Sequence, residues 1–161
     1  MTFSNANNIR DYFDGGRAAI VDVMNRGKVT VDDVNFLRRE IFADDMVSAE
    51  EAAALFVLER NVEDKTPEWT ALFVEAVTAY VVWQIRPTGV VNEAQGEWLI
   101  QQADRTRTLN SLAVLVNVMA EAHRVPLWFR AAVRSRVSRD WPGAAEALAA
   151  ADAEARDEIA A

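Results

Sequence analysis

The chain has 161 residues, of which 51% are hydrophobic and 26% are charged, and its net charge is −8. This length favours one domain with a hydrophobic core of its own. The absence of cysteine excludes disulfides, thiolate metal sites and thiol catalysis, and the acidic balance argues against nucleic-acid binding through the overall field of the protein.

The first part of the chain is predicted to form three helices. One covers residues 9–24, where Gly15 and Gly16 weaken the helix. The next two start alike, with Val, then Ser or Thr, then an acidic residue three positions further on. The two patterns are Val29-Thr30-Val31-Asp32-Asp33 and Val47-Ser48-Ala49-Glu50-Glu51. Ser and Thr are preferred N-caps, and an acid three residues later completes a capping box, so helices should begin there.

Residues 66–85 form the expected central helix. Thr66 is a suitable N-cap and Pro67 fits the first helical position. Apolar residues recur at helical spacing and make one stripe, which consists of Trp69, Leu72, Phe73, Ala76, Val77 and Tyr80. Four more, Val74, Val81, Val82 and Ile85, widen the apolar surface beyond this stripe. A helix apolar on most of its circumference is buried by neighbours on more than one side.

The second part of the chain repeats the first pattern and ends in an alanine-rich stretch. Val91-Asn92-Glu93-Ala94-Gln95 starts another helix, and further helices follow Thr106 or Thr108 and then Pro126. Because the pattern recurs on both sides of residues 66–85, a weak internal duplication is expected. The prediction is an all-α, single globular multi-helix domain over residues 1–141, with pseudo-duplicated halves around a central buried helix. An acidic, Ala-rich C-terminal helix over residues 142–161 completes it.

The recurring pattern also suggests calcium. Alignment with the late half of an EF-hand loop puts Asp33, Glu51 and Gln95 at the last ligand position. The early positions do not offer three oxygen ligands in any copy, and helix caps explain the same residues without a metal. The remaining candidate for ion binding is the acidic cluster from Asp44-Asp45 to Glu50-Glu51. Calcium or magnesium is therefore expected to bind weakly or not at all.

These same stretches carry a family resemblance. The segment LRREIFADDMVSAEEAAALFVLER, with WTALFVEAVTAYVVWQ and VVNEAQGEWLI, resembles the TerB-like (tellurite-resistance-associated) helical domains, most of all uncharacterised members of alphaproteobacterial type. The resemblance covers about residues 29–122 and implies a helical domain with acidic motifs at helix junctions. Divalent-ion binding has been inferred for some members, and the matching positions here are Asp44, Asp45 and Glu51. The family motif usually has Gly at the place of Asp45.

The remaining site-like residues have simpler structural interpretations. His123, the single histidine, is expected to pack or cap near a helix end. Trp69, Trp98 and Trp128 fall on predicted apolar faces and should be core, whereas Trp83 and Trp141 are candidate exposed anchors.

One local region is basic although the chain is acidic. Residues 104–141 carry seven basic and three acidic side chains, and the last twenty residues carry one basic and five acidic. Arg130 and Arg134, one helical turn apart, could bind phosphate or RNA, form a solvated face, or pair with acidic residues of this chain. With Trp141 they are the candidate partner-binding residues. The acidic tail is expected to dock loosely on these arginines or on a partner's basic face.

Three functions stay open from the sequence. The first is a non-enzymatic helical interaction module for an unknown protein partner, weakly responsive to divalent ions. The second is a metal-dependent enzyme or ion sensor that uses the Asp44–Glu51 cluster. The third is an accessory subunit docked through the C-terminal helix. No nucleic acid, no membrane and no cofactor beyond a weak divalent cation are expected. The first ten residues do not form a secretory signal, so a cytoplasmic location is expected.

Overall fold

The computed structural model describes residues 15–137, and helices make up most of this part. The helices are α2 (Gly15–Arg26), α3 (Val31–Ile41), α4 (Ala49–Asn61), α5 (Pro67–Thr78), the π-helical turn η1 (Ala79–Trp83), α6 (Glu93–Thr106), α7 (Leu109–Glu121) and α8 (Leu127–Ser135). Two strands of two residues each, β1 (Lys28–Val29) and β2 (Asp64–Lys65), form a parallel pair. The predicted all-α fold is confirmed. Trp141 and the expected helix over residues 142–161 lie outside the described residues.

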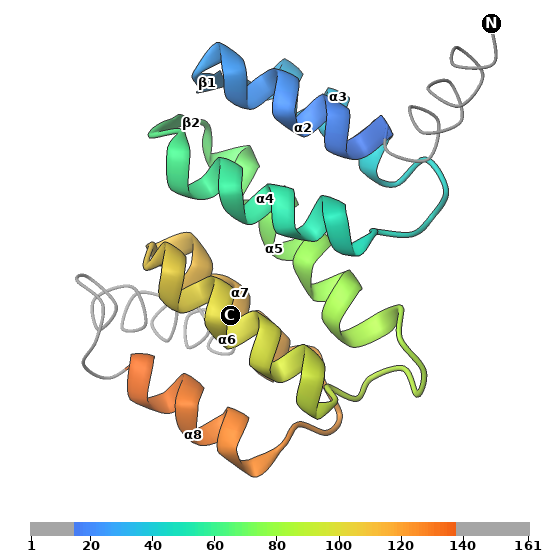
Figure 1. Cartoon of the computed structure of the whole chain (residues 1–161), viewed down its shortest axis with the longest axis vertical. Helices are drawn as coiled ribbons and strands as arrows, with labels where there is room; N and C mark the ends of the chain where they lie inside the picture. Colours follow the sequence, from blue (N-terminus) through green and yellow to red (C-terminus); the bar gives the residue numbers. More distant parts are fainter. Residues whose placement is uncertain (1–14, 138–161) are drawn as a thin grey trace, which may run out of the picture.

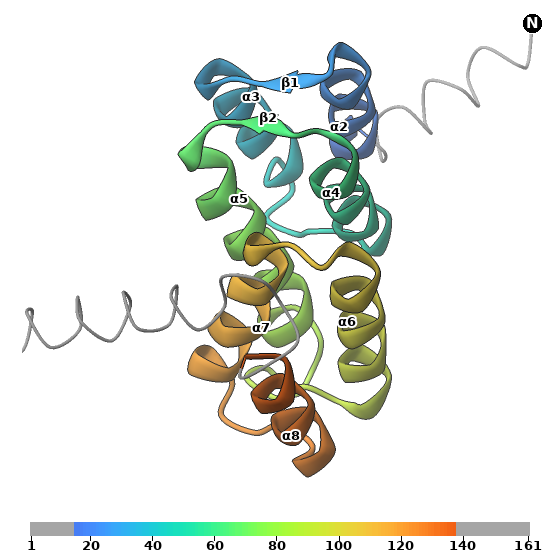
Figure 2. The same ribbon diagram turned by 90° about the vertical axis from the view of Figure 1, so that its left-hand side faces the viewer.

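The chain folds into two halves that share α5. Helices α2, α3 and α4 lie around one end of α5, and α6, α7 and α8 lie around the other (Figures 1 and 2). Each half contains one parallel bridge: β1 pairs with β2 in the first, and Val90 pairs with Arg124 in the second. In the first half, the bridge joins the residues before α3 to the residues before α5. In the second half, it joins the residues before α6 to the residues before α8. The helices α5 and α8 each have a proline at their start. This arrangement agrees with the predicted pseudo-duplication.

Local capping explains where the helices begin. Thr30 and Ser48 form the predicted capping boxes with Asp33 and Glu51. Asn92 accepts a hydrogen bond from the Gln95 backbone. The start of α7, left open between Thr106 and Thr108, is a third box between Thr108 and Ser111. Since Ser111 is not acidic, the sequence pattern did not include it. Thr66 precedes α5 as predicted but makes no side-chain capping bond.

The predicted stripe of the central helix is buried apart from Tyr80, which is half-buried. Trp69, Leu72, Phe73, Ala76 and Val77 have no exposed surface. The Phe73 ring stacks on Trp69 and meets Phe56 of α4 edge-on at 5.0 Å. The α-helix ends at Thr78, earlier than predicted, and continues through the π turn, in which the Gln84 N–H donates to the Ala79 carbonyl.

The assignment of Trp128 to the core was wrong. Its side chain is 37% exposed, whereas the next residue, Phe129, is fully buried. The indole N–H donates to Glu93 Oε2 at 2.6 Å, and the ring lies over Gly96, where a Cβ atom would come within 3.1 Å of it. Trp128 therefore covers α6 from the outside.

Between residues 15 and 137, no helix is long and apolar enough to cross a membrane.

Candidate functional site

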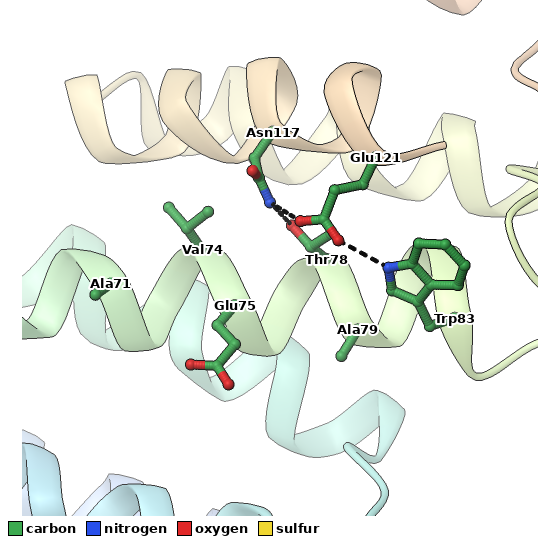
Figure 3. A pocket seen from close by; sticks show the side chains of 8 residues that line it. All are labelled: Ala71, Val74, Glu75, Thr78, Ala79, Trp83, Asn117 and Glu121. Atoms are coloured by element: carbon green, nitrogen blue, oxygen red, sulfur yellow. Dashed lines mark hydrogen bonds between the residues drawn. The ribbon is translucent and has the colours of Figure 1, made fainter. Parts of the chain in front are cut away.

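A surface hollow of about 350 Å³ lies between α5 and α7 (Figure 3). Its lining is Ala71, Val74, Glu75 and Thr78 of α5, Ala79 and Trp83 of η1, and Asn117 and Glu121 of α7. These eight residues are called the α5–α7 groove. The groove follows the side of α5 that the buried stripe leaves free. Its floor is made of small apolar side chains, of which Ala71 is exposed and Val74 half-buried.

One end of the groove is a fixed hydrogen-bond network. The Trp83 indole N–H donates to Glu121 Oε1 at 2.9 Å, and Asn117 Nδ2 donates to Glu121 Oε2 at 2.7 Å and to Thr78 Oγ1 at 2.9 Å (Figure 3). The Trp83 ring also meets His123 edge-on at 5.9 Å. Trp83 is 39% exposed, so it is held in place while part of the residue remains accessible. π-helical turns often occur at functional sites, and this one carries Trp83.

The rim of the groove is acidic. Glu75 has a side chain that is 54% exposed and forms an ion pair with Arg38 of α3. Glu121 supplies a second exposed carboxylate near the other end. A ligand on this surface meets an apolar floor between two acidic side chains.

The candidate metal ligands lie in different surroundings. Asp44 and Asp45 are exposed in the turn after α3, where Asp44 Oδ1 accepts the Met46 N–H and Asp45 has a left-handed φ of 59°. Glu51 is only 5% exposed, and its Oε1 accepts the Ser48 N–H at 2.9 Å. A Cβ atom at Gly16 would lie 1.8 Å from Glu51 Oε2, so this carboxylate is packed against α2. Within residues 15–137, no group of three His, Cys, Asp or Glu side chains is arranged to hold a metal ion.

The candidate arginines lie on the outer face of α8. Arg130 and Arg134 are exposed and form no ion pair with any other residue between 15 and 137. Arg136 instead pairs with Asp104 of α6, with nitrogen–oxygen distances of 2.6 and 2.7 Å. The third member of that predicted set, Trp141, is outside the described part. His123 packs on Trp83 and above Gly89, which supports its predicted structural role.

Sequence reasoning missed a buried carboxylate in α4. Glu59 is 3% exposed and accepts hydrogen bonds from Trp69 Nε1 at 3.3 Å and Asn110 Nδ2 at 2.8 Å. Thr108 Oγ1 and Lys65 Nζ each lie 3.5 Å from one of its oxygens. Trp69 and Asn110 belong to the first turns of α5 and α7, so the carboxylate faces the N-terminal ends of two helices.

The position of Glu59 could have been found from helical periodicity. It follows Ala52, Leu55 and Phe56 at the spacing of one buried helix face. A second hollow, of about 390 Å³, opens beside it between α4, α5 and α7. In the described part, Thr66 Oγ1 is a buried side-chain oxygen without a hydrogen-bond partner at this place. Because several donors already surround Glu59, the cluster is best understood as a structural joint between the two halves.

Comparison with protein-family models, with curated proteins and with solved structures finds no match for this chain. The function therefore has to be argued from the geometry of the α5–α7 groove and from the exposed residues around it.

Proposed function

We propose that this protein is a non-enzymatic helical interaction module that binds a basic amphipathic helix of a partner protein in the α5–α7 groove. The observation that carries the proposal is the uncovered apolar side of the central helix, hollowed between α5 and α7. Peptide helices are commonly bound by laying an apolar face into such a groove.

The size of the floor residues favours a helix as the ligand. Ala71, Val74 and Thr78 follow one another at steps of three and four residues and form a ridge along α5. Small side chains on such a ridge let a second helix approach closely. The partner helix would set its own apolar residues, also three and four apart, beside this ridge. Trp83 would contact the end of that helix with the exposed part of its ring.

The charge of the rim favours a basic ligand. Glu75 and Glu121 lie at the margins of the apolar floor, and the whole chain carries a net charge of −8. Lysine or arginine side chains flanking the apolar stripe of the partner would meet these carboxylates. Rim charges of this kind mainly raise the association rate and make it dependent on salt.

The polar groups of the groove support binding in preference to catalysis. Thr78, Asn117 and Glu121 are hydrogen-bonded to one another and to Trp83, so their bonds hold the surface in shape. The resemblance to TerB-like helical domains fits the same proposal, since it too implies a helical module. Sensitivity to divalent ions would be a secondary property at most.

Site-specific photo-cross-linking tests this proposal. A photoreactive residue replaces Ala71 in the groove, and the matched control replaces Ala94, which is exposed on α6 outside it. We expect a discrete adduct with a partner protein from position 71, in cells of the organism that makes this protein. The cross-linked site should map to a segment of the partner with helical apolar periodicity and flanking Lys or Arg. The Val74→Glu change should abolish this adduct. Equal labelling from position 94, or mapping to an acidic or non-helical segment, would reject the proposal.

A synthetic peptide of the mapped segment allows the binding affinity to be measured. Titration should show about tenfold weaker binding to Val74→Glu, because a charge then lies on the apolar floor. The control Leu127→Glu, at a residue 86% exposed on α8, should bind like the original protein. Binding that is unchanged in Val74→Glu would place the ligand elsewhere.

A further inference from the structure

Arg60 lies between α4 and α6 without a carboxylate partner. It belongs to the last turn of α4 and is half-buried. Its Nη1 donates to Gln102 Oε1 at 3.4 Å and to Thr106 Oγ1 at 3.2 Å, and both acceptors are neutral groups of α6. Within residues 15–137, Arg60 forms no ion pair. The guanidinium is therefore oriented by neutral groups while its charge stays uncompensated.

Arg105 brings a second positive charge to the same place. It follows Gln102 by three residues in α6, and residues three apart are neighbours on one side of a helix. Burial lowers the pKa of Arg60, and the nearby Arg105 guanidinium lowers this pKa further by repulsion. Arg105 is exposed, and its side chain forms no ion pair in the described part of the chain. Arg60 and Arg105 are called the arginine pair.

The acidic residues that adjoin the arginine pair in the sequence are engaged elsewhere. Glu59 is buried and forms an ion pair with Lys65. Asp104 forms an ion pair with Arg136 of α8. A partly buried charge beside a like charge is unfavourable unless a counter-charge is supplied. Since the residues between 15 and 137 place no carboxylate on the arginine pair, a ligand is the source of counter-charge that fits this site.

We propose that the arginine pair binds a phosphate monoester in its doubly charged form. The N–H groups of a guanidinium form a planar fork that matches the oxygens of phosphate. Two guanidinium groups balance two negative charges, whereas a carboxylate ligand would balance one of them. A compact ligand is favoured over a polyanion such as nucleic acid, because the whole chain has a net charge of −8.

This site is separate from the α5–α7 groove. Helices α4 and α6 lie on the right in Figure 2, and α5 and α7 lie on the left. The arginine pair contributes no residue to the lining of the groove. The phosphate site is therefore a second binding function, independent of the partner helix proposed for the groove.

Titration with an end-blocked phosphoserine peptide tests the proposal. The original protein should show saturable binding at neutral pH and fixed ionic strength. Arg60→Gln and Arg105→Gln should each weaken this binding at least about tenfold, because each removes one charged donor. The matched control is Arg130→Gln, at an exposed arginine of α8, which should bind like the original protein. Equal binding by all four proteins, or no saturable binding by the original protein, would overturn the proposal.

The choice of probe defines the ligand. The same peptide without phosphate should not bind, and binding by it would contradict recognition of the phosphate. Phosphoserine has a second pKa of about 6, so its binding should weaken at pH 5; undiminished binding there would contradict the doubly charged form. Inorganic phosphate separates two sources of the group. Equal affinity for it would indicate small phosphate compounds, and tighter binding of the peptide would indicate a phosphorylated protein segment. Both results support the site.

Urea melts provide a second readout in which each protein serves as its own reference. Excess phosphoserine peptide should raise the midpoint of the original protein and of Arg130→Gln, because a ligand stabilises the state that binds it. The midpoints of Arg60→Gln and Arg105→Gln should not change. Differences in intrinsic stability cancel in this comparison, and the exposed position 105 gives a folded variant if Arg60→Gln fails to fold. Stabilisation of Arg105→Gln as large as that of the original protein would reject the site. None of these measurements depends on the partner of the α5–α7 groove.

Discussion

Asp33, Glu51 and Glu59 are acidic side chains that are each less than one-tenth exposed. Each of them has a structural role. Asp33 and Glu51 complete capping boxes, and Glu59 connects α4 to the first turns of α5 and α7. Buried carboxylates persist where they are hydrogen-bonded or paired. At the residue scale, these acids act as structural connectors.

Glu59→Gln should destabilise the protein by about 3 kcal/mol, because Lys65 then loses its buried counter-charge. Lys65 has a side chain that is only 11% exposed, so water cannot replace the carboxylate fully. Urea melts measure the change. The control is Glu63→Gln, exposed in the same hollow, which should stay within about 0.5 kcal/mol. A loss below about 1 kcal/mol for Glu59→Gln would contradict the role of this ion pair.

Calorimetric titration with calcium should show binding weaker than the micromolar range of calcium sensors. Calcium should bind weakly because the Glu51 carboxylate already accepts the Ser48 N–H and is packed against Gly16. Asp44 and Asp45 alone would provide a solvated pair of charges. A micromolar dissociation constant that Glu51→Gln abolishes would show that the capping box opens to bind the ion.

Local patterns in the sequence predicted where several of the helices begin. The starts of α3, α4 and α6 depend on residues within three positions of one another, and Thr30, Ser48 and Asn92 identified them. The stripe of α5 was predicted by periodicity. Long-range geometry was not predictable in this way, as shown by the π turn, the pairing of β1 with β2 and the burial of Glu59. The groove depends on where α7 lies against α5, which no short window contains.

The start of α3 should make the stability depend on acidic pH. Burial, the largest single influence, raises the pKa of Asp33, but hydrogen bonds from Thr30 and the Arg26 guanidinium outweigh it and hold the pKa below its usual value. The charged carboxylate therefore stabilises the fold above the unfolded-state pKa, and this contribution is lost as the pH falls through the folded-state pKa. Asp33→Asn should lower the stability at neutral pH, and the stability of this variant should fall less steeply as the pH becomes acidic. Melts at several pH values test this, with Asp32→Asn as the exposed control. If the stability of Asp33→Asn depends on acidic pH as in the original protein, the prediction is wrong.

Within α5, Trp69→Ala and Phe73→Ala should each cost about 3–5 kcal/mol, because both side chains are fully buried. Trp83→Ala at the end of η1 should cost less, as this residue is 39% exposed. Denaturant melts compare the three variants. Losses under about 1 kcal/mol for Trp69 or Phe73 would mean that the stripe packs against nothing rigid.

On the scale of the whole molecule, several contacts tie the two halves together. Helix α5 packs against α3 in one half and α7 in the other. Glu59 of α4 accepts hydrogen bonds from Asn110 of α7. The Gln84 side chain pairs with both the N–H and the carbonyl of Val47, at 2.5 Å each. The two halves therefore form one packed unit, because neither contains a complete core without α5.

This sharing predicts a single unfolding transition. Leu37→Ala in α3 and Leu115→Ala in α7 remove fully buried side chains from opposite halves, and each should cost about 2–5 kcal/mol. If the halves unfold together, each change lowers the midpoint seen by tryptophan fluorescence and by far-UV circular dichroism equally. Hydrogen exchange adds resolution: under Leu115→Ala, the amides of α2–α4 should lose protection along with those of α6–α8. Protection that survives in α2–α4 while α6–α8 exchange freely would show two independent units joined by a helix.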